Sequence, residues 1–305
     1  MVPAAAQRFA VADGFRRCEE TPMKWLGRDR RGTAPSNLVP KSDARWEPAC
    51  WEDLAVLVPP RDLWVGPQDP LVHFFRWAWE YRAYLGLLCN LRATSSVLEI
   101  GCNHGRTMLG LVGLLDPPGC YEGFDILAPQ IEFAQREIQS RHPHLRFSIV
   151  DVFNGTYNPG GRVSAETLRF PYDSSSFDVA YAASVFTHLV PAAAANYLRE
   201  TRRVLRPGGR CLFSFFLLDR YRGRGTSSCE LYEFEHLIEG GVATHDAERP
   251  EAVIAYSRAR LEKLAADAGL RVERVLPGYW TASDDAVTNE QDLVVFVADD
   301  SASAA

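Results

Sequence analysis

The sequence lacks the features that mark membrane, secreted and nucleic-acid-binding proteins. No apolar stretch approaches the roughly 20 residues of a membrane-spanning helix. The N-terminus has no charged start, long apolar core and small-residue cleavage site of the kind found in signal peptides. The net charge of the chain is −6 at pH 7. We therefore expect neither a nucleic acid nor a membrane as a partner.

The spacing of the potential metal ligands is equally uninformative. The seven cysteines are scattered, and no two have the C-x-x-C spacing of a zinc site. Asp, Glu and His also show no diagnostic ligand spacing, so we expect no metal. An odd number of cysteines within apolar runs is typical of the reducing cytoplasm, which is the expected location.

What the chain does contain is a regular alternation of strand and helix patterns. Its 305 residues, 47% of them hydrophobic, suffice for one large α/β domain with added segments. The patterns predict strands over 96–101, 121–126, 145–152, 177–183, 210–218, 271–276 and 293–298. They predict helices over 107–115, 130–140, 192–205 and 258–268. This order favours a seven-stranded, mainly parallel sheet with helices on both faces.

The domain with this alternation spans residues 95–299 and has insertions at 153–170 and 219–257. The segments outside it are a tail and loop at 1–60, a helical cap segment at 61–94 and a C-terminal tail at 300–305. Both insertions follow strands, at the edge of the sheet where ligands bind. We expect the insertions and the cap segment to cover a ligand.

The cap segment includes a predicted helix over 70–91, where apolar residues recur at spacings of three and four after Pro70. Its aromatic stripe has two interpretations. It packs the helix against the sheet, which is the commoner meaning of such a stripe, or it forms a lid over a substrate. The aromatic residues expected to favour a sizeable, partly apolar substrate are Phe74, Trp77, Tyr81, Tyr157 and Trp280.

The stretch SSVLEIGCNHGR at 95–106 predicts a strand, a tight turn and the start of a helix. Gly101 ends the apolar run, and Asn103 and Gly105 follow. Glycine permits a left-handed backbone and a close approach of a ligand to backbone amides. Asn tolerates left-handed geometry better than most residues. The turn is therefore a predicted ligand site at the carboxyl end of the first strand.

The order of motifs resembles that of the class I S-adenosylmethionine-dependent methyltransferases, a family with a Rossmann-like sheet. The motifs that carry the resemblance are VLEIGCNHGR (97–106), YEGFDIL (121–127), FSIVDV (147–152), RFPYDSSSFDVAYAASVFTHL (169–189) and YLRETRRVLRPGGRCLFS (197–214). The match covers about residues 95–216, and a weaker match covers 257–299. It leaves the first 60 residues and both insertions unexplained.

The resemblance implies S-adenosylmethionine as the cofactor and assigns its contacts. Glu99 would hold the amino-acid end, Asp125 the ribose hydroxyls and Asp151 the adenine amino group. Asp125 also lies 24 residues beyond Gly101, near the roughly 20 expected between such a turn and a ribose-binding acid. Without the resemblance, Glu99 would be a paired core acid and Asp151 a turn cap. The implied cofactor contacts are Glu99, Gly101, Cys102, Asn103, Gly105, Asp125, Ile126, Asp151, Val152, Ala183 and Ser184.

Methyl transfer requires a nucleophile in line with the S–CH3 bond and the exclusion of water. A hydroxyl or amine acceptor must also lose a proton. His188, just past the fourth strand, is the candidate catalytic base, although a lone His is more often structural. Further candidates whose spacing decides nothing are Tyr157, Tyr172, Asp219, His236 and His245.

Taken with the resemblance, these features predict methyl transfer to a small-molecule acceptor in a capped pocket, as an O-methylation in secondary metabolism. N- or C-methylation stays open, as does a repurposed fold that binds the cofactor without methyl transfer. A nicotinamide oxidoreductase is disfavoured because the turn reads G-C-N-H-G-R and not G-x-G-x-x-G. The acidic balance disfavours a nucleic-acid methyltransferase. A homodimer is compatible with the sequence, which does not decide the oligomeric state.

Overall fold

The structure is a computed structural model that describes residues 57–64, 71–228, 232–281, 286, 288 and 290–298. Most of the predicted tail at 1–60 and the whole of the tail at 300–305 lie outside the described residues. No helix in the described ranges is long and apolar enough to cross a membrane.

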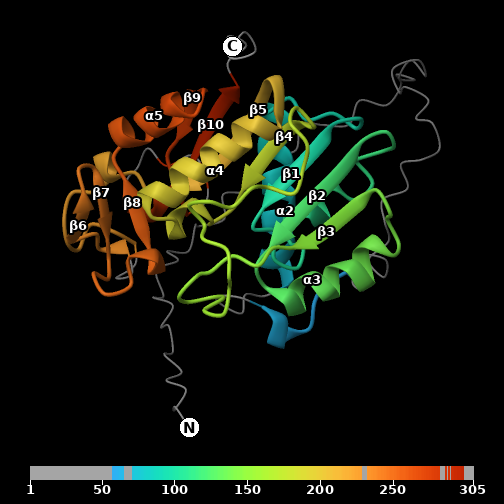
Figure 1. Cartoon of the computed structure of the whole chain (residues 1–305), viewed down its shortest axis with the longest axis horizontal. Helices are drawn as coiled ribbons and strands as arrows, with labels where there is room; N and C mark the ends of the chain where they lie inside the picture. Colours follow the sequence, from blue (N-terminus) through green and yellow to red (C-terminus); the bar gives the residue numbers. More distant parts are fainter. Residues whose placement is uncertain are drawn as a thin grey trace, which may run out of the picture. The chain divides into compact units, whose positions relative to one another are not determined.

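A seven-stranded sheet forms the centre of the domain (Figure 1). Its strands are β1 (Ser96–Ile100), β2 (Cys120–Asp125), β3 (Leu145–Ile149), β4 (Phe177–Ala182), β5 (Leu205–Phe215), β9 (Leu270–Leu276) and β10 (Asp292–Ala298). Their order is β3-β2-β1-β4-β5-β10-β9, and β10 pairs antiparallel with both of its neighbours. The predicted α/β fold with a mainly parallel sheet is confirmed. The order reverses between β1 and β4, and a ligand crevice forms at such a point.

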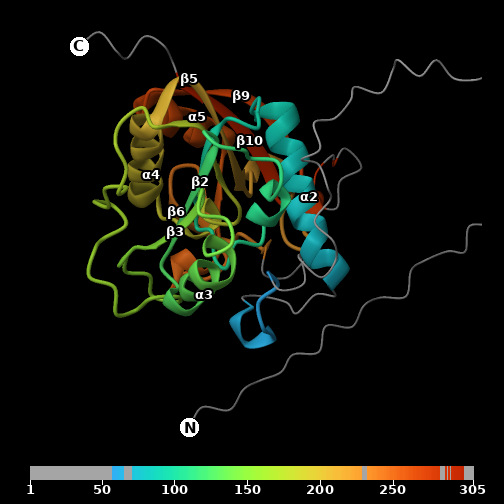
Figure 2. The ribbon, with the colours of Figure 1, turned by 90° about the vertical axis from the view of Figure 1, so that its right-hand side faces the viewer.

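Helices cover both faces of the sheet, as Figure 2 shows. The first face carries α2 (Leu71–Leu88) and α3 (Ala128–Ala134), and the second carries α4 (Pro191–Val204) and α5 (Arg258–Asp267). Pro191 occupies the first turn of α4, where its missing N–H costs no hydrogen bond. The side chain of Ser257 caps α5 by accepting a hydrogen bond from the Arg260 amide.

The aromatic stripe of α2 packs against the first face of the sheet. Phe74, Tyr81 and Leu85 are buried there together with Val97 of β1. The ring centroids of Tyr81 and Tyr181 are 5.9 Å apart. The packing interpretation of this stripe is therefore the one that the structure supports for Phe74 and Tyr81.

The predicted helix over 107–115 is wrong. Only a short 3-10 helix, Met108–Leu111, forms in this stretch. Gly113 has a φ of +72°, which ends any right-handed helix. Gly110 lies so close to α2 that a Cβ atom there would be 2.1 Å from the carbonyl oxygen of Ala78. The close packing of Gly110 against α2 and the left-handed backbone at Gly113 therefore prevent a regular helix in this stretch.

The insertion at 219–257 contains a second sheet that the sequence patterns did not predict. Its three antiparallel strands are β6 (His236–Glu239), β7 (Val242–Thr244) and β8 (Ile254–Tyr256). Phe216, Phe234 and Trp280 form the centre of an apolar cluster beside this sheet. Short strands of three or four residues leave too little alternation to be recognised in a sequence.

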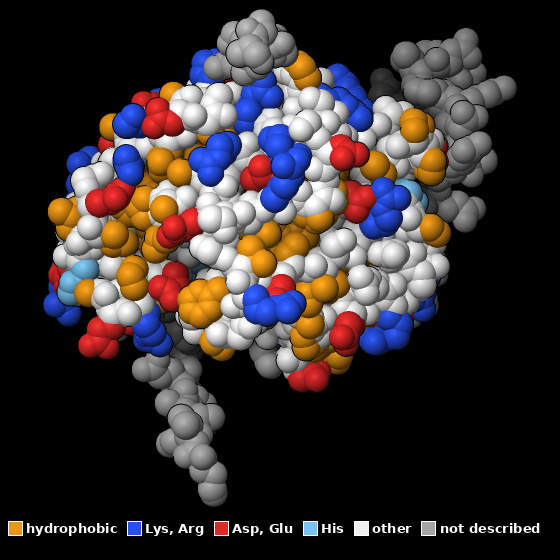
Figure 3. Space-filling view, in the orientation of Figure 1, with side chains coloured by type: hydrophobic (Ala, Val, Ile, Leu, Met, Phe, Trp, Pro, Cys, Tyr) orange, Lys and Arg blue, Asp and Glu red, His pale blue; other side chains and the backbone are white. Residues whose placement is uncertain are grey.

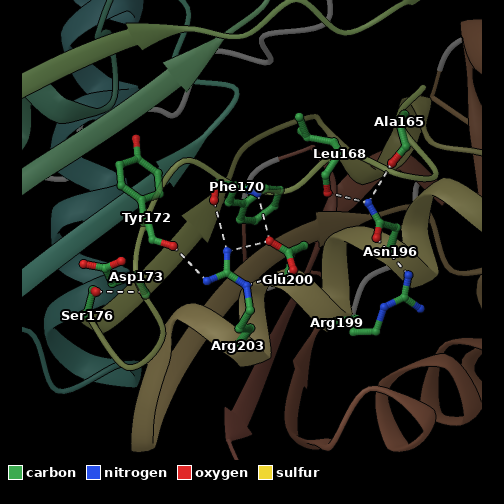
Figure 4. A network of polar contacts seen from close by, with 10 residues as sticks. All are labelled: Ala165, Leu168, Phe170, Tyr172, Asp173, Ser176, Asn196, Arg199, Glu200 and Arg203. Carbon is green, nitrogen blue, oxygen red and sulfur yellow. Dashed lines mark hydrogen bonds and ion pairs between the residues drawn. The ribbon is translucent and has the colours of Figure 1, made fainter. Parts of the chain in front are cut away.

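The second half of the insertion at 153–170 is fixed to α4 (Figure 4). The side-chain amide of Asn196 donates to the carbonyl oxygens of Ala165 and Leu168 at 3.0 and 2.9 Å. The guanidinium of Arg203 donates to the carbonyl oxygen of Phe170, and the carboxylate of Glu200 accepts from the amide of Phe170. These hydrogen bonds satisfy the backbone of a segment that has no strand or helix of its own.

Candidate functional site

The turn after β1 has the left-handed backbone that its sequence predicts. Gly101, Asn103 and Gly105 have φ values of +71°, +49° and +84°. A Cβ atom on Gly101 would lie 2.4 Å from Cγ2 of Val185, so only glycine fits beneath the segment that follows β4. The side chain of Asn103 stabilises the turn by accepting a hydrogen bond from the His104 amide at 2.8 Å. Cys102 is buried beneath it.

Asp125 connects this turn to the end of β2. One carboxylate oxygen accepts the Asn103 amide at 2.7 Å, and the other accepts the amides of Ile126 and Leu127 at 2.7 and 3.0 Å. Burial raises the pKa of Asp125, and the three amides oppose that shift. A carboxylate offers about four lone-pair sites, and the three amides use three of them, so about one site, on Oδ2, is left for a ligand hydroxyl.

Glu99 lies within β1, 1% exposed, and points to the face covered by α2. The hydroxyls of Tyr121 and Tyr181 donate to Oε2 at 2.5 and 2.7 Å, and the hydroxyl of Thr107 donates to Oε1. Burial raises the pKa of Glu99 to about 7, although the three hydroxyls lower it. A buried acid with this pKa can exchange its proton near neutral pH, so its charge can respond to a cationic ligand.

Asp151 and Val152 follow β3 at the same edge of the sheet. Val152 is buried, whereas the carboxylate of Asp151 is accessible and pairs with Arg162 of the insertion at 2.5 Å. This pair lowers the pKa of Asp151 and keeps it ionised. Asp151 therefore presents a charged acceptor to the carboxyl edge of the sheet.

Ser184 follows Ala183 at the end of β4 and has a φ of +57°, a rare conformation for a residue with a side chain. Its amide donates to Oγ of Ser214 at 2.7 Å, and its hydroxyl accepts from the side chain of Gln291 at 2.5 Å. Ser214 and Gln291 were missed by the sequence reasoning. Nothing in their local sequence indicates that they reach the same residue from β5 and from the approach to β10.

His188 lies where the two insertions meet. Its Nδ1 atom is 3.1 Å from the carbonyl oxygen of Glu251, and its ring is 5.7 Å from that of Tyr157. Nδ1 must carry the proton to donate to a carbonyl oxygen, which leaves Nε2 as an acceptor. Burial lowers the pKa of His188, so the imidazole is neutral at physiological pH. This is a chemically competent form of a general base.

The other candidates are distributed more widely. Tyr172 packs between Phe124 and Phe177 within the core. Asp219 accepts a hydrogen bond from the amide of Arg258 at 2.6 Å, at the start of α5. His236 is exposed on β6, and His245 is half-buried after β7. None of these contacts joins the cluster around Gly101 and Asp125. No group of three potential metal ligands occurs among the residues that the structure describes.

Some of the aromatic residues that were expected to line a cap are instead part of the core. Phe74, Tyr81 and Trp280 are each at most 1% exposed. The indole of Trp280 donates to Oδ2 of Asp292 at 2.7 Å. Trp77 is partly buried and stacks on Tyr81 at 6.1 Å, whereas Tyr157 is 38% exposed. Tyr157 is thus the residue of this set with the most accessible ring.

His104 is a further residue of the turn that the sequence reasoning did not single out. Its ring stacks on that of Phe74 with centroids 5.6 Å apart, and burial lowers its pKa to about 4. Because it stays neutral, His104 can close the turn against α2 without placing a charge in the core.

Comparison with known proteins gives matches in the same region. Residues 98–213 match the family model described as a methyltransferase domain. The chain is 27% identical over 193 residues to the 27-O-demethylrifamycin SV methyltransferase of Amycolatopsis mediterranei, covering 57% of this chain and 62% of that protein. It is 30% identical over 193 residues to phthiotriol/phenolphthiotriol dimycocerosates methyltransferase 1 of Mycobacterium ulcerans, covering 63% of this chain and 59% of that protein. The chain thus spans less than two thirds of the length of both relatives.

Among solved structures, the fold is similar to that of the PH0226 protein of Pyrococcus horikoshii OT3. The TM-score is 0.50 at 19% identity, over 75% of this chain and 92% of that chain. At this identity the likeness concerns the fold.

Proposed function

This chain carries a class I S-adenosylmethionine-dependent methyltransferase domain, and we propose that it transfers the cofactor's methyl group to a hydroxyl of a small molecule in secondary metabolism. The observation that carries the proposal is the arrangement of Asp125 and the turn at Gly101. A carboxylate with one spare acceptor site lies against a left-handed glycine turn at the point where the strand order reverses.

The donor set of the site fits the proposed cofactor. Asp125 would bind the ribose, with one acceptor site on Oδ2 left for a hydroxyl, and Asp151 would accept from the adenine amino group. Glu99 would face the ammonium of the amino-acid end, which favours the ionised form of an acid with a pKa of about 7. The cofactor supplies a sulfonium methyl group that is already electrophilic. The protein has to orient the acceptor, exclude water and accept a proton.

We assign the role of base to His188. Its neutral ring has Nδ1 fixed by the Glu251 carbonyl, so Nε2 can accept the proton of a hydroxyl. His188 is the last residue of the short 3-10 helix Phe186–His188, which follows Ser184 and the end of β4. A weak base of this kind suits a hydroxyl acceptor that loses its proton as the new bond forms.

Exposed apolar side chains support an acceptor that is partly apolar. Large hydrophobic residues with exposed side chains gather in one short segment at the carboxyl edge, namely Ile149, Phe153, Tyr157 and Val163. On the face drawn in Figure 3, hydrophobic side chains lie in the middle of the surface with charged side chains around them. The names of the two curated relatives also refer to small molecules, 27-O-demethylrifamycin SV and the phthiotriol or phenolphthiotriol dimycocerosates. Free cysteines at Cys89, Cys102, Cys120 and Cys211 agree with a cytoplasmic location.

Calorimetric titration with S-adenosylhomocysteine and, separately, with NAD tests the cofactor assignment. We expect only S-adenosylhomocysteine to bind, and Asp125→Ala to weaken it about 100-fold, because hydrogen bonds to a charged group contribute about 1.5–3 kcal/mol each. Asp267→Ala, on the exposed surface of α5, is the matched control and should bind normally. Binding of NAD, or equal affinities in wild type and Asp125→Ala, contradicts the assignment.

A screen of acceptors then tests the reaction. Turnover on small molecules with hydroxyl groups supports the proposal, and turnover only on proteins or basic polymers refutes it. Tight binding of S-adenosylhomocysteine together with no methyl transfer to any acceptor favours a repurposed fold that keeps the cofactor.

A further inference from the structure

Residues 151–163, which include the first half of the insertion at 153–170, form a loop that closes just after the end of β3. The amide of Phe153 donates to the carbonyl oxygen of Val163 at 2.8 Å. The amides of Arg162 and Val163 both donate to the carbonyl oxygen of Asp151, at 3.2 and 2.9 Å. Gly161 allows this closure, since a Cβ atom there would lie 2.4 Å from the backbone of residue 152. Backbone hydrogen bonds therefore suffice to close the loop.

The side chain of Arg162 makes a contact that loop closure does not require. Its Nε atom donates to Oδ2 of Asp151 at 2.5 Å. Asn158 also contributes, since its amide group donates to the carbonyl oxygen of Val152 at 2.9 Å and its side chain bonds to the Asp151 carboxylate. The Arg162 side chain is 86% exposed, and an ion pair so open to solvent adds little to stability. Stability is thus a poor explanation for this pair.

We infer that Arg162 is a positioning residue for base recognition, and that it orients the Asp151 carboxylate so that the site prefers a 6-amino purine to a 6-oxo purine. This inference rests on the cofactor site proposed above, in which Asp151 accepts from the base. The ion pair engages a single oxygen of Asp151, and the carboxylate keeps lone pairs for another donor.

The chemistry of the two bases explains the expected preference. An exocyclic amine donates to a fixed carboxylate, whereas an oxo group in the same place would bring two acceptors together. A carboxylate that rotates freely can turn away from the oxo group and loses part of this discrimination. Arg162 reaches Asp151 from the far end of the loop, so it restricts that rotation without itself touching the base. A residue that fixes the orientation of a recognition group raises selectivity more than it raises stability.

The test measures the affinities of the full-length protein for S-adenosylhomocysteine and S-inosylhomocysteine by calorimetry. The variants are Arg162→Gln, Asp151→Asn and the control Arg146→Gln. Arg146 is a suitable control because it forms another exposed pair, with Glu122 on the neighbouring strand. We expect the preference for S-adenosylhomocysteine to fall about three- to fivefold in Arg162→Gln, the range for loss of one exposed charged contact. Asp151→Asn should abolish most of the preference, and Arg146→Gln should retain it.

The outcomes separate this inference from the function on which it rests. If Arg162→Gln weakens the binding of both ligands equally, Arg162 only shapes the loop. If the variant binds S-adenosylhomocysteine more tightly than the wild type, Arg162 competes with the base for the Asp151 carboxylate. An unchanged preference also overturns the inference. In all three cases the proposed cofactor site stands as long as Asp151→Asn abolishes the preference. A wild-type protein that binds neither ligand, or both equally, refutes the cofactor site itself and the inference with it.

Discussion

Replacing Glu99 by Gln should change how the stability of the protein depends on pH. Glu99 is fully buried among Thr107, Tyr121 and Tyr181, and its pKa rises from 4.5 to about 7. A folded-state pKa above the unfolded value means that the folded protein favours the protonated form. The resulting contribution to stability is fully present below pH 4.5 and is lost as the pH rises through about 7.

The size of the effect follows from the pKa shift. Each pKa unit corresponds to about 1.4 kcal/mol, so ionisation of Glu99 costs the folded state about 3 kcal/mol in total. About 2 kcal/mol of this falls between pH 5 and pH 8. Gln resembles the protonated acid in shape and cannot ionise. Its amide can donate to and accept from the surrounding hydroxyls, because a hydroxyl both donates and accepts.

Urea unfolding, followed by circular dichroism at several pH values and constant ionic strength, measures this difference. The free energy of unfolding of the wild type should fall relative to Glu99→Gln by about 2 kcal/mol between pH 5 and pH 8. Glu132→Gln removes a carboxyl from the exposed surface of α3 and should follow the wild type. Parallel curves for wild type and Glu99→Gln would show that the three hydroxyls fully stabilise the ionised acid, and would refute the reasoning.

Other substitutions test the base and the anchors of the two insertions. His188→Gln should lower kcat about 100-fold or more and leave the affinity for S-adenosylhomocysteine unchanged. The rate of the wild-type enzyme should be independent of pH above pH 6.5, because burial lowers the pKa of the His188 imidazole. A rate that still rises above pH 7 would exclude His188 as the base. Asp292→Asn should cost about 3 kcal/mol in urea unfolding, since the fully buried carboxylate pairs with Arg220 of the second insertion at 3.4 Å. The same carboxylate accepts from the amides of Leu217 and Gly278 and from the indole of Trp280. Asn196→Ala should cost about 2 kcal/mol, because it leaves two carbonyl groups of the first insertion without their donor. A loss below about 0.5 kcal/mol in either stability variant would mean that water replaces the lost partner.

Short-range patterns were enough to predict the sheet and the turn. The apolar run at 97–100 and the glycines after it predicted β1 and a left-handed turn, and both occur as expected. The predicted helix at 107–115 was wrong because apolar periodicity does not register how closely Gly110 packs against α2. The strands β6 to β8 were missed because each is too short to show an alternation.

The tertiary structure alone decided what surrounds each polar residue of the site. Glu99 bonds to Tyr121 and Tyr181, which are 22 and 82 residues away, and Ser184 bonds to Gln291, 107 residues away. The local sequence does not identify such partners, because they meet only when strands and loops from distant parts of the chain pack side by side. The sequence by itself determined where the acids and glycines stand along the carboxyl edge of the sheet. Folding determined their burial, and with it the pKa of Glu99 and the orientation of Asp151.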